Sequence, residues 1–325
     1  MSSSTFSSGP KDDAPSDNDV ADTSGAPNGK QADNSVVNQL FRVNPDLKSG
    51  LYVVSTPIGN LRDISLRALD ILASVDLVLA EDTRVARKLL SAFGLNPTLR
   101  PYHDHNGAKV RPDIIESLLG GQRVALISDA GTPLVSDPGF KLARDAIEAG
   151  ADVTAIPGAS APLAALTISG LPSDRFLFAG FPPPKSSARL SFLEKFKDID
   201  ATLIFFEGGS RLGESLQDMA KSFGARPAAI CRELTKKFEE AIRAPLDELA
   251  STISEEGPPR GELVVLVGPP DKSVTADQSV IDAAIIAALQ EMPVKSASNA
   301  VAEQFGLKKR DVYARALALK DGNTH

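Results

Sequence analysis

The chain has 325 residues, enough for two α/β domains and a small additional module. Its 42% hydrophobic and 24% charged residues are typical of a globular protein, and its formal net charge of −7 argues against a general binder of polyanions. The single cysteine, Cys231, excludes an internal disulfide framework and suits a reducing compartment. Because no apolar run reaches the ~18 residues of a membrane span and the N-terminus lacks a secretory signal, we predict a cytoplasmic protein without membrane contact.

The first 48 residues are rich in Ser, Asp, Asn, Gly and Pro and carry four basic and seven acidic side chains. A segment with so few apolar residues cannot bury enough surface to offset the entropy of ordering it. We therefore predict a disordered tail over residues 1–48.

The next part of the chain alternates strand-like and helix-like segments. Short apolar runs predict strands at 51–55, 77–80, 99–102, 123–128 and 153–156. We expect Asp63 to cap the helix after the first strand, and Asp137 to cap the helix after the fourth, with Pro138 in its first turn. Strands separated by helix-length segments predict a parallel sheet and an α/β domain over residues 49–170.

A second series of strands predicts a second α/β domain over residues 171–270. These strands are expected at 176–179, 202–206, 228–231, 238–243 and 262–267. A polar linker then leads to helical segments at 279–291 and 296–320, the latter broken at Gly306. Together they predict a small helical module over residues 277–321.

Three loops of the first domain each follow a predicted strand directly. They are Thr56–Asn60, Asp129–Pro133 and Pro157–Ala161. A single loop of this kind is usually a simple turn, but ligands bind at the carboxyl ends of parallel strands, where glycine allows close backbone approach. Three such loops therefore indicate a ligand crevice. The glycine patterns typical of dinucleotide and nucleotide triphosphate sites are absent, which disfavours those ligands.

Residues 51–268 resemble the tetrapyrrole-methylase-like class of S-adenosylmethionine methyltransferases and, within it, the ribosomal RNA small subunit methyltransferase I family. The order and spacing of eight segments carry the resemblance: Ser55–Leu61, Ala80–Arg84, His103–Asn106, Ser128–Leu134, Ser136–Gly139, Gly170–Phe176, Cys231–Lys236 and Arg260–Glu262. The resemblance implies 2′-O-methylation of a cytidine ribose in the decoding region of 16S ribosomal RNA. It also implies a homodimer and two α/β domains with a cofactor cleft between them.

The resemblance also implies which residues bind S-adenosylmethionine. Pro57, Ile58 and Gly59 would line its methionine side, and Asp129, Ala130, Gly131 and Thr132 would flank its ribose and sulfonium. The pocket would be closed by Ala159, Ser160, Phe206, Glu207 and Leu234. The segment 207–211 departs from the family pattern, which has bulkier polar residues in place of Gly208–Ser210.

A protonated 2′-hydroxyl is a poor nucleophile, so a nearby proton acceptor would help the reaction. The candidates are Asp82, Glu81 and His105, with Arg84 and His103 as RNA contacts. A helix-capping turn at 81–84 and a plain surface turn at 103–106 explain these residues about as well. Two histidines without a third ligand do not indicate a metal, and we predict none.

The C-terminal module has a local excess of four positive charges between residues 294 and 320. Lys308, Lys309, Arg310 and Arg315 follow a helix-turn-helix-like break and are candidates for RNA contact. The alternative is a solvated basic face.

Two other functions stay open at this point: a tetrapyrrole C-methyltransferase with the same fold and cofactor, and a non-catalytic ribosome-assembly factor. The basic module and the segment 103–106 favour RNA over a tetrapyrrole, and the intact glycine loops disfavour the factor.

Overall fold

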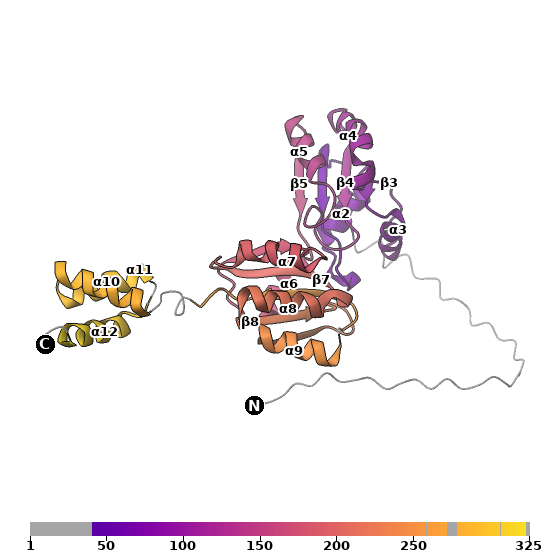
Figure 1. Ribbon diagram of the computed structural model, residues 1–325. Helices are drawn as coiled ribbons and strands as arrows, with labels where there is room; N and C mark the ends of the chain where they lie inside the picture. The colour runs from indigo at the N-terminus through magenta and orange to yellow at the C-terminus, as the bar shows by residue number, and fades with distance from the viewer. Residues whose placement is uncertain (1–40, 258, 272–277, 306, 323–325) are drawn as a thin grey trace, which may run out of the picture.

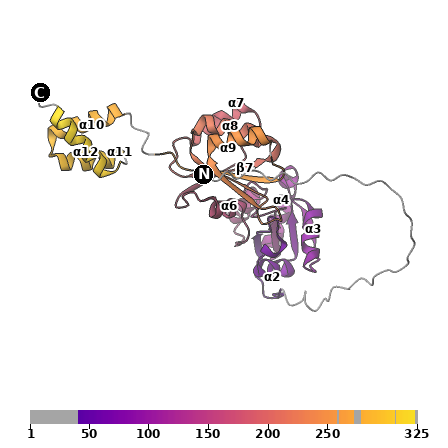
Figure 2. The ribbon, with the colours of Figure 1, turned by 90° about the horizontal axis from the view of Figure 1, so that it is seen from below.

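The computed structural model describes residues 41–257, 259–271, 278–305 and 307–322. Residues 1–40 of the predicted tail and Gly306 lie outside this range. Two five-stranded sheets with flanking helices adjoin each other, and both views show three further helices as a separate bundle (Figures 1 and 2). The predicted fold class, two α/β domains with a C-terminal helical module, is confirmed.

All strands of the first sheet are parallel, as predicted, and their order is β3-β2-β4-β1-β5. They are β1 (Gly50–Val54), β2 (Leu77–Ala80), β3 (Leu99–Pro101), β4 (Arg123–Ile127) and β5 (Val153–Ile156). Side chains alternate between the faces. Tyr52 and Val54 pack against α2 (Leu66–Ser74) and α3 (Thr83–Ala92), whereas Leu51 and Val53 pack against α4 (Asp104–Leu119) and α5 (Phe140–Glu148).

Both predicted helix caps are wrong. Ser65 caps α2 by accepting a hydrogen bond from Ala68 N. Asp63 is instead the last residue of the short 3-10 helix η1 (Leu61–Asp63). Gly139 stands at the N-cap of α5, so Asp137 belongs to the loop before that helix.

The second sheet has the order β6-β7-β10-β8-β9, parallel between β6 and β7 and antiparallel elsewhere. Its strands are β6 (Phe176–Gly180), β7 (Thr202–Gly208), β8 (Pro227–Arg232), β9 (Glu240–Pro245) and β10 (Glu262–Val267). One face packs against α7 (Ser186–Leu193), α8 (Leu212–Phe223) and α9 (Leu246–Glu256), with η2 (Glu194–Phe196) and η3 (Gly209–Arg211) between the longer elements. The other face packs against α6 (Ala161–Ser169) (Figure 2).

Packing places two segments differently from the sequence prediction. Ala165 and Leu166 of α6 lie in the core of the second sheet, although we expected residues 49–170 to form one domain. Phe41 and Leu47 pack against the core of the first domain, and Arg42 N donates to Asp70 Oδ1 at 2.6 Å. Residues 41–48 are therefore ordered, in contrast to the predicted tail.

The C-terminal module consists of α10 (Gln278–Glu291), α11 (Val294–Phe305) and α12 (Lys309–Gly322). Ile285, Val301 and Ala316 are buried at the centre of this bundle. The helix α11 ends at Phe305 and α12 begins at Lys309, and the break predicted at Gly306 lies outside the described residues. No helix among the described residues is both long and apolar enough to cross a membrane.

Candidate active site

The three predicted glycine loops meet at the carboxyl ends of β1, β4 and β5. The chain runs from β1 to β2 in one direction across the sheet and from β4 to β5 in the opposite direction. The helices that follow β1 and β4 therefore cover opposite faces of the sheet, and a crevice opens between these two neighbouring strands. Thr56 N donates to Gly131 O at 2.8 Å and Gly131 N donates to Thr56 O at 3.2 Å. Thr132 Oγ1 lies 3.0 Å from Ser55 Oγ and donates to Ala159 O at 3.2 Å. Hydrogen bonds thus join the three loops into one wall.

Two adjoining hollows of about 300 and 170 Å³ lie between this wall and the second sheet. We call them together the interdomain cavity. Nine of the residues predicted to bind the cofactor line it: Ile58, Asp129, Ala130, Gly131, Thr132, Ser160, Phe206, Glu207 and Leu234. Residues far apart in the sequence, from both domains, therefore converge on one space.

The other three residues predicted to bind the cofactor do not line the interdomain cavity but lie next to residues that do. Ala159 accepts the hydrogen bond from Thr132, and Pro57 is buried next to Ile58. Gly59 contacts the loop after β8, since a Cβ there would lie 2.5 Å from Lys236 Cγ. Asn60 N also donates to Thr235 Oγ1 at 3.0 Å, so this loop and the loop after β1 join the two domains.

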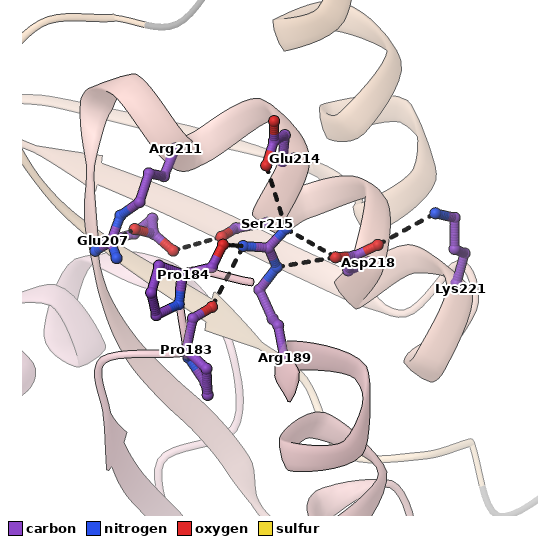
Figure 3. Close-up of polar contacts among 9 residues, drawn as sticks. All are labelled: Pro183, Pro184, Arg189, Glu207, Arg211, Glu214, Ser215, Asp218 and Lys221. Atoms are coloured by element: carbon purple, nitrogen blue, oxygen red, sulfur yellow. Dashed lines mark hydrogen bonds and ion pairs between the residues drawn. The ribbon is translucent and has the colours of Figure 1, made fainter. Parts of the chain in front are cut away.

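On the second sheet, Glu207 is buried at the end of β7 and held by three donors (Figure 3). Its carboxylate accepts hydrogen bonds from Ser215 Oγ at 2.5 Å and Gly208 N at 2.9 Å, and pairs with Arg211 at 2.9 Å. Gly209 approaches Pro259 O too closely for any Cβ. Glycine at position 209 is therefore a packing requirement in this chain, whereas a Cβ at Gly208 would meet nothing within 4 Å.

Strained backbone occurs on both sides of the cavity. Leu134 and Ser136 of the first domain, and Glu233 and Thr235 of the second, all have positive φ although none is glycine. Such conformations cost roughly 1–3 kcal/mol each and concentrate at functional sites. Of these four residues Ser136 lines the cavity, and Leu234, which lies between the other pair, lines it as well.

Known proteins share this architecture and much of its sequence. Residues 50–250 match the family described as tetrapyrrole (corrin/porphyrin) methylases. The ribosomal RNA small subunit methyltransferase I of Mesorhizobium japonicum is 52% identical over 277 residues, which cover 85% of this chain and 94% of that protein. The chain belongs to the ribosomal RNA small subunit methyltransferase I family.

Other members of the methyltransferase I family are similar over nearly their whole length. The Pseudomonas aeruginosa protein is 46% identical, with 82% of this chain and 96% of that protein covered. Residues 275–320 match the C-terminal helix-turn-helix domain of the family. A crystal structure of diphthine synthase has the same fold, with a TM-score of 0.53, 18% identity and coverage of 67% of this chain and 89% of that one.

The three predicted catalytic residues differ in exposure, in hydrogen bonding and in the pKa of their side chains. Asp82 caps α3, accepting from Arg84 N at 2.8 Å, and the Arg84 side chain lowers the pKa of Asp82 to about 2, so its carboxylate is a weak base. His105 is exposed and its ring lies 6.0 Å from that of His103. Burial and the neighbouring Asp129 carboxylate raise the pKa of Glu81.

Asp137 lines the interdomain cavity, a role that the sequence analysis missed by assigning it to a helix cap. Burial and the Glu81 carboxylate raise the pKa of Asp137 to about 6. Its segment, Ser136–Gly139, is one of those that carry the family resemblance. That resemblance was the signal in the sequence that could have identified Asp137 as a site residue. Phe181, Glu262, Leu263 and Val264 also line the cavity and were not predicted.

The four basic residues of the C-terminal module that were predicted to contact RNA differ in their surroundings. Lys308, Lys309 and Arg310 are exposed around the start of α12. Arg315 Nε donates to Asp282 Oδ1 at 2.8 Å, and this pair joins α12 to α10. Arg315 thus has a structural role in the bundle.

In the part of the chain that the structure describes, no group of three His, Cys, Asp or Glu side chains could hold a metal ion.

Proposed function

We propose that this chain uses S-adenosylmethionine to methylate the ribose 2′-hydroxyl of a cytidine in 16S ribosomal RNA. The observation that carries the proposal is the 52% identity to a ribosomal RNA small subunit methyltransferase I across 94% of that protein. A match of this extent includes both domains and the helix-turn-helix module.

The interdomain cavity fits the cofactor in size and chemistry. Its hollows of about 300 and 170 Å³ have the dimensions of a small-molecule site. Apolar walls from Ile58, Phe206 and Leu234 suit the adenine and the methionine chain, and the exposed Asp129 carboxylate suits hydroxyl or ammonium groups. At Gly131, with φ of +82°, the backbone reaches the cavity without a side chain in the way.

When bound, S-adenosylmethionine supplies a methyl group activated by a sulfonium. The chain has to orient the ribose oxygen and exclude water. The hydrogen-bonded loops and the buried Glu207 anchor provide rigid walls, because their polar groups already have partners. Binding of the sulfonium in the interdomain cavity would keep competing water from it.

The C-terminal module disfavours a tetrapyrrole substrate, because a small molecule needs no helix-turn-helix domain to dock it. The positive-φ residues Leu134, Ser136, Glu233 and Thr235 around the cavity disfavour a purely structural factor, since strain of this kind serves a functional site.

The direct test is mass mapping of ribose methylation on small-subunit RNA from cells with and without this protein. We expect one methylated cytidine to lose its methyl group in the deletion strain. Incubation of the isolated subunits with the purified protein and S-adenosylmethionine should restore it. Unchanged methylation in both steps would contradict the proposed function.

The exposed basic residues around the start of α12 give a further prediction. Changing Lys308, Lys309 and Arg310 to Gln should weaken binding to small subunits. It should also flatten the salt dependence of binding, by about 0.7–0.9 slope units for each phosphate that the protein no longer neutralises. Cofactor affinity should stay unchanged.

The matched control changes Lys185, Lys195 and Lys197 to Gln, which removes the same charge from the surface around α7. If both triple variants lose affinity equally, net charge and not the module attracts the RNA.

We also propose that the protein acts in the cytoplasm, where its ribosomal substrate is found, and that it forms a homodimer. Analytical ultracentrifugation tests the second point, and a monomer at micromolar concentration would contradict it.

A further inference from the structure

A second cavity of about 450 Å³ lies next to the interdomain cavity, and we call it the α4–α5 cavity. It is formed where the start of α4 approaches the start of α5, and these two helices lie side by side on one face of the first sheet (Figure 1). The lining residues that matter here are His103, Ala108 and Arg111 of the α4 region and Asp137, Phe140 and Lys141 of the α5 region.

The chemistry of the α4–α5 cavity suits a single nucleotide. The Phe140 side chain is 62% exposed at its wall, and exposed aromatic rings are platforms on which RNA bases stack. Lys141 is exposed next to it and offers a cation for a phosphate. Arg111 is held in place by Asp145, at 2.5 Å.

Asp137 connects the two spaces. It lines the α4–α5 cavity and both hollows of the interdomain cavity. Leu134 and Ser136 of its loop have positive φ, and the Ser128 hydroxyl before this loop donates to Gly131 O at 3.2 Å. The Asp137 carboxylate lies at the boundary between the proposed cofactor site and the proposed nucleotide site.

We propose that the α4–α5 cavity receives the target cytidine, turned out of the RNA, and that Asp137 accepts the proton of its 2′-hydroxyl. This inference rests on the proposed function and adds to it the substrate subsite and the proton acceptor. Enzymes that modify a nucleotide commonly extrude it into such a pocket.

The step balances in atoms and charge. The ribose oxygen forms a bond to the methyl carbon as the carbon–sulfur bond breaks, and the sulfonium leaves as a neutral thioether. The hydroxyl proton moves to the Asp137 carboxylate and from there to water. No metal and no redox partner is required.

The groups around Asp137 predict the direction of its pH dependence. Burial and the Glu81 and Asp129 carboxylates raise its pKa to about 6, and the Ser128 hydrogen bond opposes them. The other charged or titratable groups that line these cavities are Tyr102 and His103 before α4, Asp104 and Arg111 on α4, Lys141 on α5, and Glu207 and Glu262 on the second sheet. A base works when deprotonated, so the single-turnover rate should rise with pH up to about 6 and then level off.

The central experiment measures single-turnover methylation of isolated small subunits against pH. Asp137→Asn should lower the plateau rate by about 100-fold or more and abolish the acidic limb, with cofactor affinity by calorimetry within a few-fold of wild type. Glu81→Gln should move the acidic limb to lower pH, because it removes a charge that raises the pKa of Asp137. A purely structural role would not produce that shift.

Two readouts do not depend on activity. Carbon-13 NMR of labelled aspartate, assigned by comparison with Asp137→Asn, should show a carboxyl titrating near pH 6 that moves to lower pH in Glu81→Gln. Ala108→Trp should fill the cavity and weaken binding to small subunits while leaving cofactor affinity unchanged. Leu119→Trp is the matched control, because Leu119 is exposed on the same helix and lies outside the cavity lining.

A plateau rate within twofold of wild type in Asp137→Asn would overturn the assignment of the proton acceptor. Full activity and normal particle binding in Ala108→Trp would overturn the assignment of the cavity. If the wild-type protein binds S-adenosylmethionine but does not methylate cytidine, the proposed function itself is contradicted, and the inference is rejected with it.

Discussion

Gly131→Arg is expected to reduce S-adenosylmethionine affinity by roughly 100-fold or more, which corresponds to about 2.7 kcal/mol. Gly131 lines the interdomain cavity with φ of +82°, and a Cβ there would lie 3.3 Å from Ile58 Cγ2. A long side chain at this position has to enter the space that the cofactor needs. Isothermal titration calorimetry should show one site per chain for the wild type and no resolvable heat for the variant.

The control for this substitution is Gly150→Arg. Gly150 has φ of +84°, so an arginine there suffers the same backbone strain, but nothing lies within 4 Å of its Cβ position. It should lose a similar amount of stability and keep its cofactor affinity. Wild-type affinity in a folded Gly131→Arg protein would place the cofactor elsewhere.

Arg189→Met is expected to lower the free energy of unfolding by roughly 3–5 kcal/mol, because it leaves a buried carboxylate without its main partner. Arg189 is only 1% exposed, and its Nε donates to Asp218 Oδ2 at 2.9 Å (Figure 3). Its Nη1 donates to Pro184 O at 3.1 Å, which fixes the loop after Phe181 of the cavity. Urea denaturation measures the loss.

The comparison variant is Arg175→Met, whose partner Asp200 is at 2.8 Å but whose side chain is 67% exposed. An exposed pair contributes at most about 1 kcal/mol, so the difference between the two variants reports the effect of burial. The double change of Arg189→Met with Asp218→Leu should recover part of the stability, because it removes the stranded charge. An Arg189→Met loss no larger than that of Arg175→Met would contradict this account.

The candidate active site shows where sequence reasoning was insufficient. The loops 56–60, 129–133 and 157–161 were recognised as a ligand crevice because each follows a strand and contains glycine. Asp137 was misassigned because an aspartate before a proline and a helix has the pattern of a cap, and the loop is longer than that pattern implies. Its burial and its proximity to Glu81 depend on two strands that are distant in the sequence.

The sequence by itself determined the strands of both sheets, the parallel direction of the strands in the first domain, the glycine loops and the family. These features depend on local or periodic patterns, so they can be recognised from residues that are close together in the sequence. Only the tertiary structure decided that α6 packs on the second sheet, that Phe41 and Leu47 join the first core and that Arg315 binds Asp282. It alone brought Asp137 to the boundary of two cavities, because contacts between distant segments follow from the packing of whole layers.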